Sequence, residues 1–126
     1  MVAVRRVLVV DDDDSIREVA EVALGLVGGW DVSTAGGGAE GLEMARASAP
    51  DAILLDVMMP GMDGPTTLAQ LRADPATRGT PVIFLTAKLR PGERRELDDF
   101  EVSGVIGKPF DPMSLAAQVG EILGWA

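Results

Sequence analysis

Carboxylates, a hydroxyl and a lysine stand at the ends of short apolar runs, in a pattern that could support phosphoryl transfer. Asp11 and Asp12 follow the first run, and Asp56 follows the third. Thr86 and Lys108 close the last two runs. Any one of these residues is ordinary at the end of a strand, where Asp and Thr often serve in turns or as helix caps. Their coincidence at four strand ends instead favours a shared site.

The chemistry available to these residue types involves a hard metal ion. Three carboxylates outnumber the single ammonium by two charges, and one divalent cation would balance the excess. Oxygen ligands favour magnesium, with manganese as the alternative, over zinc. A carboxylate beside such an ion can attack phosphorus as a nucleophile, while the ion, a hydroxyl and a lysine hold the phosphoryl oxygens.

The elements that must position these residues alternate between strand and helix. Short apolar runs rich in β-branched residues predict buried strands, and apolar residues at helical spacing predict the helices between them. The predicted strands are 7–10, 30–35, 52–55, 81–85 and 105–106. The predicted helices are 15–27, 39–47, 65–73, 92–101 and a last one that begins at 111–112. Five such units indicate an α/β fold with a parallel sheet covered on both faces, whose ligands bind at the carboxyl ends of the strands.

Two helix starts carry their own signals. Asp13, Asp14 and Ser15 are all candidate N-caps of the first helix. For the last helix, Asp111 is predicted as the N-cap and Pro112 as the first helical residue.

The composition indicates one globular domain and excludes several kinds of chemistry. The 126 residues fit a single domain spanning 1–126, with 47% apolar and 25% charged residues. Neither cysteine nor histidine is present, which excludes disulfides, thiolate catalysis, histidine bases and histidine-ligated zinc. Eleven basic residues against 20 acidic ones give a formal charge of −9, which argues against nucleic acid as a partner.

Nothing in the sequence indicates a membrane segment or an export signal. No apolar run reaches the roughly 18–20 residues of a membrane span, and the N-terminal residues lack the pattern of a signal peptide. We therefore expect a cytoplasmic protein without a membrane partner, as a monomer or a weak dimer.

Four stretches of the chain resemble the receiver domain of bacterial two-component response regulators, of which the chemotaxis regulator is the simplest relative. They occur in the order and spacing of that family, and they are Val7–Asp12, Leu54–Gly64, Leu85–Ala87 and Lys108–Phe110. The resemblance covers essentially the whole chain. It implies a flavodoxin-like, doubly wound, five-stranded parallel sheet of strand order 2-1-3-4-5, with five helices.

The resemblance also implies a role for each polar residue at the strand ends. Asp56 would accept the phosphoryl group and take part in metal binding. Asp12 would bind magnesium directly, Asp11 would assist mainly through water, and the backbone carbonyl of Met58 would complete the protein ligands.

Two further residues would contact the phosphoryl group once it is attached. Thr86 would donate its hydroxyl to it, and Lys108 would pair with it. The family also implies a cis peptide bond before Pro109.

The chain departs from the family pattern in places that bear on switching. Many receivers carry an aromatic residue at the position of Val105, and its inward swing accompanies phosphorylation. Valine cannot make that swing. Glu101 replaces a small residue that is common near the end of the fourth helix, with Phe100 beside it, and Gly37-Gly38 replaces the usual Asp-Gly or Asn-Gly.

The resemblance implies a phosphorylation switch, with no turnover of a substrate. A histidine kinase or a histidine phosphotransfer protein would donate the phosphoryl group, and an output protein that the sequence does not identify would read the result. Two alternatives stay open. One is an adaptor that keeps the fold but works without phosphorylation. The other is a magnesium-dependent phosphohydrolase, which Met58 disfavours because such enzymes commonly place a second Asp at that position.

Overall fold

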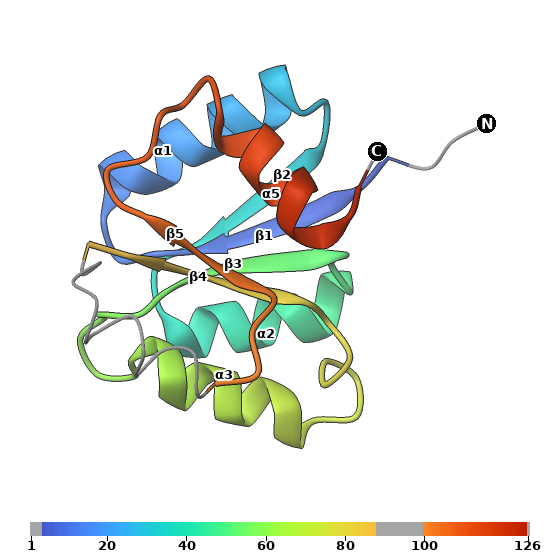
Figure 1. The fold of residues 1–126 in the computed structure, drawn as a ribbon. Helices are drawn as coiled ribbons and strands as arrows, with labels where there is room; N and C mark the ends of the chain where they lie inside the picture. The colour runs from blue at the N-terminus through green and yellow to red at the C-terminus, as the bar shows by residue number, and fades with distance from the viewer. Residues whose placement is uncertain (1–3, 88–99, 126) are drawn as a thin grey trace.

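A five-stranded parallel sheet lies between two layers of helices (Figure 1) in the computed structural model, which describes residues 4–87 and 100–125. The strands are β1 (Arg6–Val10), β2 (Asp31–Ala35), β3 (Ala52–Asp56), β4 (Val82–Thr86) and β5 (Gly104–Gly107). Their order is β2-β1-β3-β4-β5, which confirms the prediction. The chain adds β2 on one side of β1 and then β3 on the other side, so the order of strand addition reverses at β1 while all strands stay parallel. Such a reversal opens a crevice at the carboxyl ends of β1 and β3.

Helices cover both faces of the sheet. One face is covered by α1 (Asp14–Val22) and α5 (Leu115–Leu123), and the other by α2 (Gly38–Ser48) and α3 (Gly64–Ala73) (Figure 1). The first helix continues into a π-helical turn, η1 (Ala23–Val27), which completes the predicted span 15–27. The helix predicted over 92–101 falls mainly on residues 88–99, which lie outside the described residues. Residues 100 and 101 are not helical.

The structure selects one N-cap for the first helix and corrects the start of the last. The Asp13 carboxylate accepts the backbone N–H groups of Ser15 and Ile16, at 2.8 and 3.3 Å, so Asp13 is the cap. The prediction that Asp111 caps the last helix is wrong. Its carboxylate accepts the N–H of Met113 at 2.9 Å and closes a separate turn, so that the helix begins only at Leu115.

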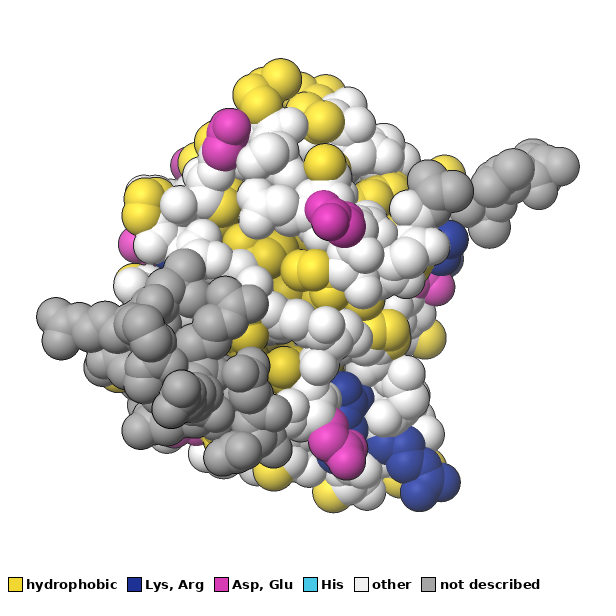
Figure 2. Space-filling view, viewed as in Figure 1, with side chains coloured by type: hydrophobic (Ala, Val, Ile, Leu, Met, Phe, Trp, Pro, Cys, Tyr) yellow, Lys and Arg dark blue, Asp and Glu magenta, His cyan; other side chains and the backbone are white. Residues whose placement is uncertain are grey.

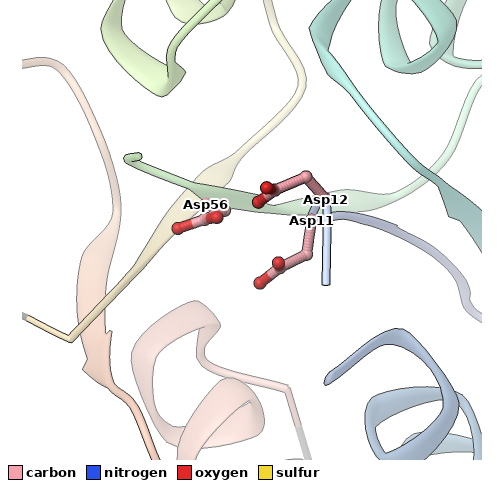
Figure 3. Close-up of side chains that lie close together, drawn as sticks. All are labelled: Asp11, Asp12 and Asp56. Atoms are coloured by element: carbon pink, nitrogen blue, oxygen red, sulfur yellow. The ribbon is translucent and has the colours of Figure 1, made fainter. Parts of the chain in front are cut away.

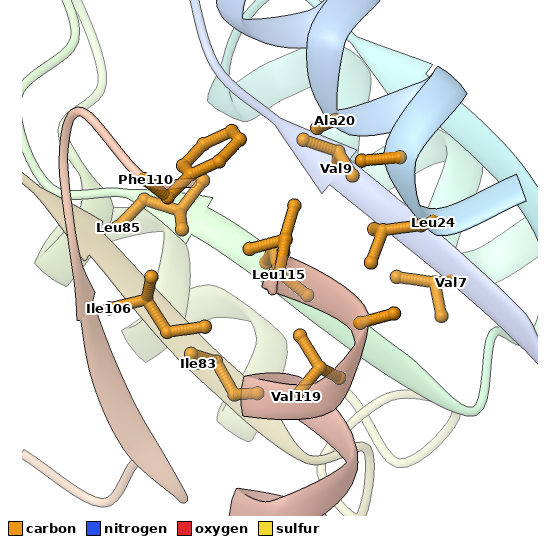
Figure 4. Close-up of a cluster of buried hydrophobic side chains, with 13 residues drawn as sticks. Val7, Val9, Ala20, Leu24, Ile83, Leu85, Ile106, Phe110, Leu115 and Val119 are labelled. Carbon is orange, nitrogen blue, oxygen red and sulfur yellow. The ribbon is translucent and has the colours of Figure 1, made fainter. Parts of the chain in front are cut away.

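Each strand sends alternate side chains into two separate apolar layers. Val7 and Val9 of β1 pack against α1 and α5, in the cluster shown in Figure 4, whereas Leu8 and Val10 pack toward α2 and α3. All five residues of β3 and of β4 are buried. The two-sided burial explains why these runs read as continuous apolar segments rather than as alternating ones. Because β1, β3 and β4 are buried in this way, the residues at their carboxyl ends are held in place by the packed core.

Within residues 4–87 and 100–125, no helix has the length and apolar character that crossing a membrane would require.

Candidate functional site

The ends of β1 and β3 bring three carboxylates together. Val10 lies opposite Leu55 in the sheet, so the next residues, Asp11 and Asp56, emerge side by side. Together with Asp12 they offer one carboxylate oxygen each, all within 4.8 Å of one another. Figure 3 shows the three side chains pointing into one space beside the strand ends. Asp11 and Asp56 are buried, at 0% and 3% exposure, whereas Asp12 is exposed to solvent.

The backbone around Asp11 is held on two sides. Its N–H donates to the carbonyl of Ala35 on β2 at 3.1 Å, and its carboxylate accepts the N–H of Asp13 at 2.9 Å. The guanidinium of Arg17 donates to the carbonyl of Asp11 at 2.7 Å and also pairs with Asp14. Sequence reasoning missed Arg17. Its position in the first turns of α1, three residues after Asp14, is the signal that could have indicated it.

The loop that follows β3 turns tightly around Asp56. The N–H of Val57 donates to the carbonyl of Leu85 at 3.0 Å, and the N–H of Gly64 donates to the carbonyl of Val57 at 2.9 Å. A Cβ atom on Gly64 would lie 2.5 Å from the carbonyl oxygen of Asp56, so only glycine fits at the start of α3. Within this loop the N–H of Met58 reaches the Asp56 carboxylate at 3.3 Å, and the Met58 side chain is exposed.

Lys108 crosses the mouth of the site from β5. Its ammonium nitrogen lies 2.9 Å from Asp11 Oδ2 and 3.1 Å from Asp56 Oδ1, with a side chain only 14% exposed. The peptide bond between Lys108 and Pro109 is cis, as predicted. The N–H of Lys108 donates to the carbonyl of Thr86 at 2.8 Å, which joins the ends of β4 and β5. Thr86 is buried at that end, opposite Gly107 in the register.

Burial and charge set the protonation of this cluster. Removal from solvent, followed in importance by the negative charge of Asp11, raises the pKa of Asp56 to about 6. Hydrogen bonds and charge attraction from Lys108 act in the opposite direction without cancelling the rise. Burial alone would lower the pKa of Lys108, but its hydrogen bonds and attraction to Asp11 and Asp56 outweigh that effect and raise it. Lys108 is therefore a cation, and the Asp56 carboxyl changes from its protonated to its ionised form around its pKa of about 6.

The donor set fits a hard divalent cation. The three residues supply only carboxylate oxygens, and the single ammonium leaves their charge uncompensated. Oxygen ligands with excess negative charge are what magnesium binds in proteins, and a cation would also favour the ionised form of Asp56. The arrangement can thus keep a buried carboxylate ionised next to a cation, which is the requirement for nucleophilic attack on phosphorus.

The five polar residues predicted from strand ends lie at one edge of the sheet. Lys108 bridges Asp11 and Asp56, and Asp12 offers a carboxylate oxygen within 4.8 Å of theirs. The register of β4 and β5 places Thr86 beside Lys108. The predicted role of the Met58 carbonyl in metal binding stays a prediction.

Comparison with known proteins places this chain in a described family. The family model of the response regulator receiver domain matches residues 7–120. Response regulator PleD of Caulobacter vibrioides is 43% identical over 114 residues, which cover 90% of this chain and 25% of PleD. The DNA-binding response regulator MtrA of Mycobacterium tuberculosis is 39% identical over 120 residues, covering 91% of this chain and 49% of MtrA. The chain thus spans a quarter to a half of these relatives.

Solved structures agree in fold over nearly the full chain. The chemotaxis response regulator CheY4 of Vibrio cholerae superposes with a TM-score of 0.87 at 32% identity, over 95% of this chain and 99% of CheY4. The N-terminal domain of a response regulator receiver protein from Methanoculleus marisnigri JR1 superposes with a TM-score of 0.74 at 40% identity, over 96% of this chain and 98% of that domain.

Proposed function

This chain belongs to the response regulator receiver domain family, and from that premise we propose that it forms one receiver domain whose phosphoacceptor is Asp56. Receiver domains are phosphorylation-dependent signalling switches of two-component systems, with histidine kinases as partners, and generally do not turn over a substrate. The observation that carries the assignment is the position of the Asp56 carboxylate. It lies at the end of β3, almost fully buried, within 4.8 Å of Asp11 and Asp12 and 3.1 Å from the Lys108 ammonium.

The geometry supports a specific sequence of bond changes. A carboxylate oxygen of Asp56 forms a bond to phosphorus while the bond between phosphorus and the donor atom breaks, and the electron pair of that bond leaves with the donor. Magnesium, when bound, neutralises charge on the phosphoryl oxygens. Asp12 and Asp11 would hold it together with Asp56 and the carbonyl of Met58. Lys108 would then pair with the phosphoryl group, and Thr86 would donate its hydroxyl to it.

A protein donor is supported by an apolar groove on the surface of the fold. The groove has a volume of about 430 Å³ and lies between α1, η1 and the loop that precedes α5. Of the eight large apolar side chains that are exposed among the described residues, five line it, namely Val19, Val22, Leu26, Val27 and Met113. Figure 2 shows hydrophobic side chains gathered at the top of the molecule, over this part of the fold. Exposed apolar surface of this kind marks a protein-binding site, so we assign it to the phosphorylated histidine kinase or phosphotransfer protein.

Incubation with acetyl phosphate and magnesium tests the assignment. We expect intact-mass analysis to show one added phosphoryl group, which hydroxylamine removes because an acyl phosphate is labile to it. Asp56→Asn should take up none, since an amide is a poor nucleophile. The exposed Asp31 lies on the edge strand β2, and Asp31→Asn serves as the matched control that should be phosphorylated like the wild type. A phosphoryl group on serine or threonine would contradict the proposal, as would steady turnover of a phosphate ester.

A further inference from the structure

We propose that the half-exposed ring of Phe100 transmits the phosphorylation state of Asp56 to the protein surface. This inference rests on the proposed function, because it requires that Thr86 shifts toward a phosphoryl group on Asp56. It assigns the coupling to a residue that precedes β5, whereas the family pattern would place it at Val105 within the strand.

The path begins at Phe84 in the centre of the sheet. Phe84 lies opposite Leu55 on β3 and opposite Val105 on β5, two of the strands whose ends carry site residues. It is two residues from Thr86 on β4, and side chains two apart point to the same face of a strand. Its exposure is 0%. A close-packed interior cannot absorb a shift of such a ring, so the neighbours of Phe84 must move with it.

Among the described residues, Phe100 is a partly exposed neighbour of Phe84. Its ring meets Phe84 edge to face, with the ring centres 5.8 Å apart and the planes at 80°. Its exposure is 38%, so one side of the ring contacts the core and the other contacts solvent. Edge-to-face pairs are directional, and their energy depends on the angle and offset of the two rings. A small displacement of Phe84 therefore changes the favoured position of the Phe100 ring.

The backbone beside Phe100 is tied to the rest of the fold. The carbonyl of Phe100 accepts the N–H of Val102 at 2.9 Å, and the N–H of Ser103 donates to the carbonyl of Val82 at 2.8 Å. The guanidinium of Arg72 on α3 donates to the carbonyl of Glu101 at 3.2 Å. Because these bonds restrain the main chain that follows Phe100, a displacement of Phe84 acts on the torsion angles of the Phe100 side chain.

Val105 is poorly suited to the same task. It packs in the same apolar cluster as Phe84, but its branched side chain has a single torsion angle with one strongly preferred setting. It has no ring that could follow the displacement of Phe84. The aromatic partner of Phe84 is therefore supplied by Phe100, from outside the strand.

The chain contains three phenylalanines, so fluorine NMR can follow each ring separately. We would incorporate 4-fluorophenylalanine and assign its signals with Phe84→Leu, Phe100→Leu and Phe110→Leu variants. Spectra would then be compared with and without magnesium and beryllofluoride, a phosphoryl mimic. Phe110 follows Lys108 by two residues and is buried in the apolar layer on the opposite face of the sheet, so its signal is the reference for changes at the site that do not pass through Phe84. We expect the Phe100 signal to shift more than the Phe110 signal, and the shift to be lost in Asp56→Asn.

Three results would overturn the inference, and they can be told apart. If beryllofluoride binds at Asp56, as its own fluorine signal would show, while the Phe100 signal stays in place, the coupling through Phe100 is wrong and the proposed function stands. If neither beryllofluoride nor acetyl phosphate modifies the site, the proposed function fails and the inference fails with it. In the Phe100→Leu variant, acetyl phosphate should still add one phosphoryl group, while the response of the Phe84 signal to beryllofluoride should be reduced. An unchanged Phe84 response in that variant would also contradict the coupling.

Discussion

At the scale of single residues, Asp56 must be ionised to act as the proposed nucleophile, although its surroundings favour the protonated form. Its pKa rises from 3.8 to about 6, chiefly through burial. Between these values the folded protein binds more protons at this group than the unfolded chain does. The contribution of Asp56 to the free energy of unfolding should therefore fall as the pH rises from about 4 to 6. The carboxylate that makes the site reactive thus destabilises the metal-free fold at neutral pH.

Replacement of Asp56 by asparagine should remove this destabilisation of the metal-free protein. We expect metal-free Asp56→Asn to be more stable than the wild type above pH 6, by on the order of 1–3 kcal/mol. The difference should vanish below about pH 3, where the wild-type carboxyl is protonated in both the folded and the unfolded state. Urea unfolding across this pH range measures the effect, with Asp31→Asn as the exposed control. A stability gain that does not depend on pH would show that the ionisation of Asp56 is not its cause.

Asp12 differs from Asp11 and Asp56 because it is exposed to solvent, although one of its carboxylate oxygens lies within 4.8 Å of theirs. We expect Asp12→Ala to reduce magnesium affinity at least tenfold, because one charged ligand is lost. A tenfold loss of affinity corresponds to about 1.4 kcal/mol of binding free energy. Relief of carboxylate repulsion should also make this variant at least as stable as the wild type without metal. Titration calorimetry measures the affinity, and unchanged binding in Asp12→Ala would remove this residue from the metal site.

At the scale of elements, the site depends on how closely α3 begins after β3. Because a Cβ atom on Gly64 would lie 2.5 Å from the Asp56 carbonyl oxygen and 2.8 Å from Val57 Cα, the added methyl group would meet backbone atoms that cannot rotate away. We expect Gly64→Ala to destabilise the protein by about 1–3 kcal/mol and to slow phosphorylation by acetyl phosphate, since Asp56 would be displaced.

The matched control for this prediction is Gly79→Ala. A Cβ atom on Gly79 would meet nothing within 4 Å, so the same substitution there should leave the urea midpoint and the phosphorylation rate close to those of the wild type. Equal effects at both positions would mean that the close approach of α3 to β3 does not govern the site.

At the scale of the whole molecule, we assign chemistry to the carboxyl ends of the strands and recognition of a protein donor to the apolar groove along α1 and η1. The groove beside α1 should matter only for a donor that is itself a protein. We expect Leu26→Asp to slow phosphoryl transfer from the phosphorylated kinase or phosphotransfer protein at least tenfold, because a charge would replace an apolar side chain that is 82% exposed. Phosphorylation by acetyl phosphate should not change, because the small donor needs no docking surface.

A second exposed apolar residue tests whether this effect is local. Val4 is 59% exposed and does not line the groove. Val4→Asp should therefore leave transfer from both donors unchanged. A loss of transfer in Val4→Asp as large as that in Leu26→Asp would indicate a general effect of added negative charge rather than loss of a docking contact.

The sequence was sufficient to predict the sheet and the composition of its polar edge. Apolar runs rich in β-branched residues can be buried on both faces, and parallel strands carry their carboxyl ends to one edge, so Asp11, Asp56 and Lys108 were expected together. Those inferences need only local patterns and a general rule of topology. The four family stretches added the strand order, which the structure confirms.

Other properties arise from contacts between residues far apart in the chain. Lys108 and Asp11 are 97 residues apart, and their 2.9 Å approach depends on how five strands pack together. The burial that raises the pKa of Asp56 and the contact of Phe100 with Phe84 likewise depend on the packed core. The start of α5 also differs from the local prediction, because the Asp111 carboxylate closes a turn with the N–H of Met113 and the helix begins at Leu115. Residue patterns specify which groups reach the edge of the sheet, while burial and distance depend on the packing of the whole fold.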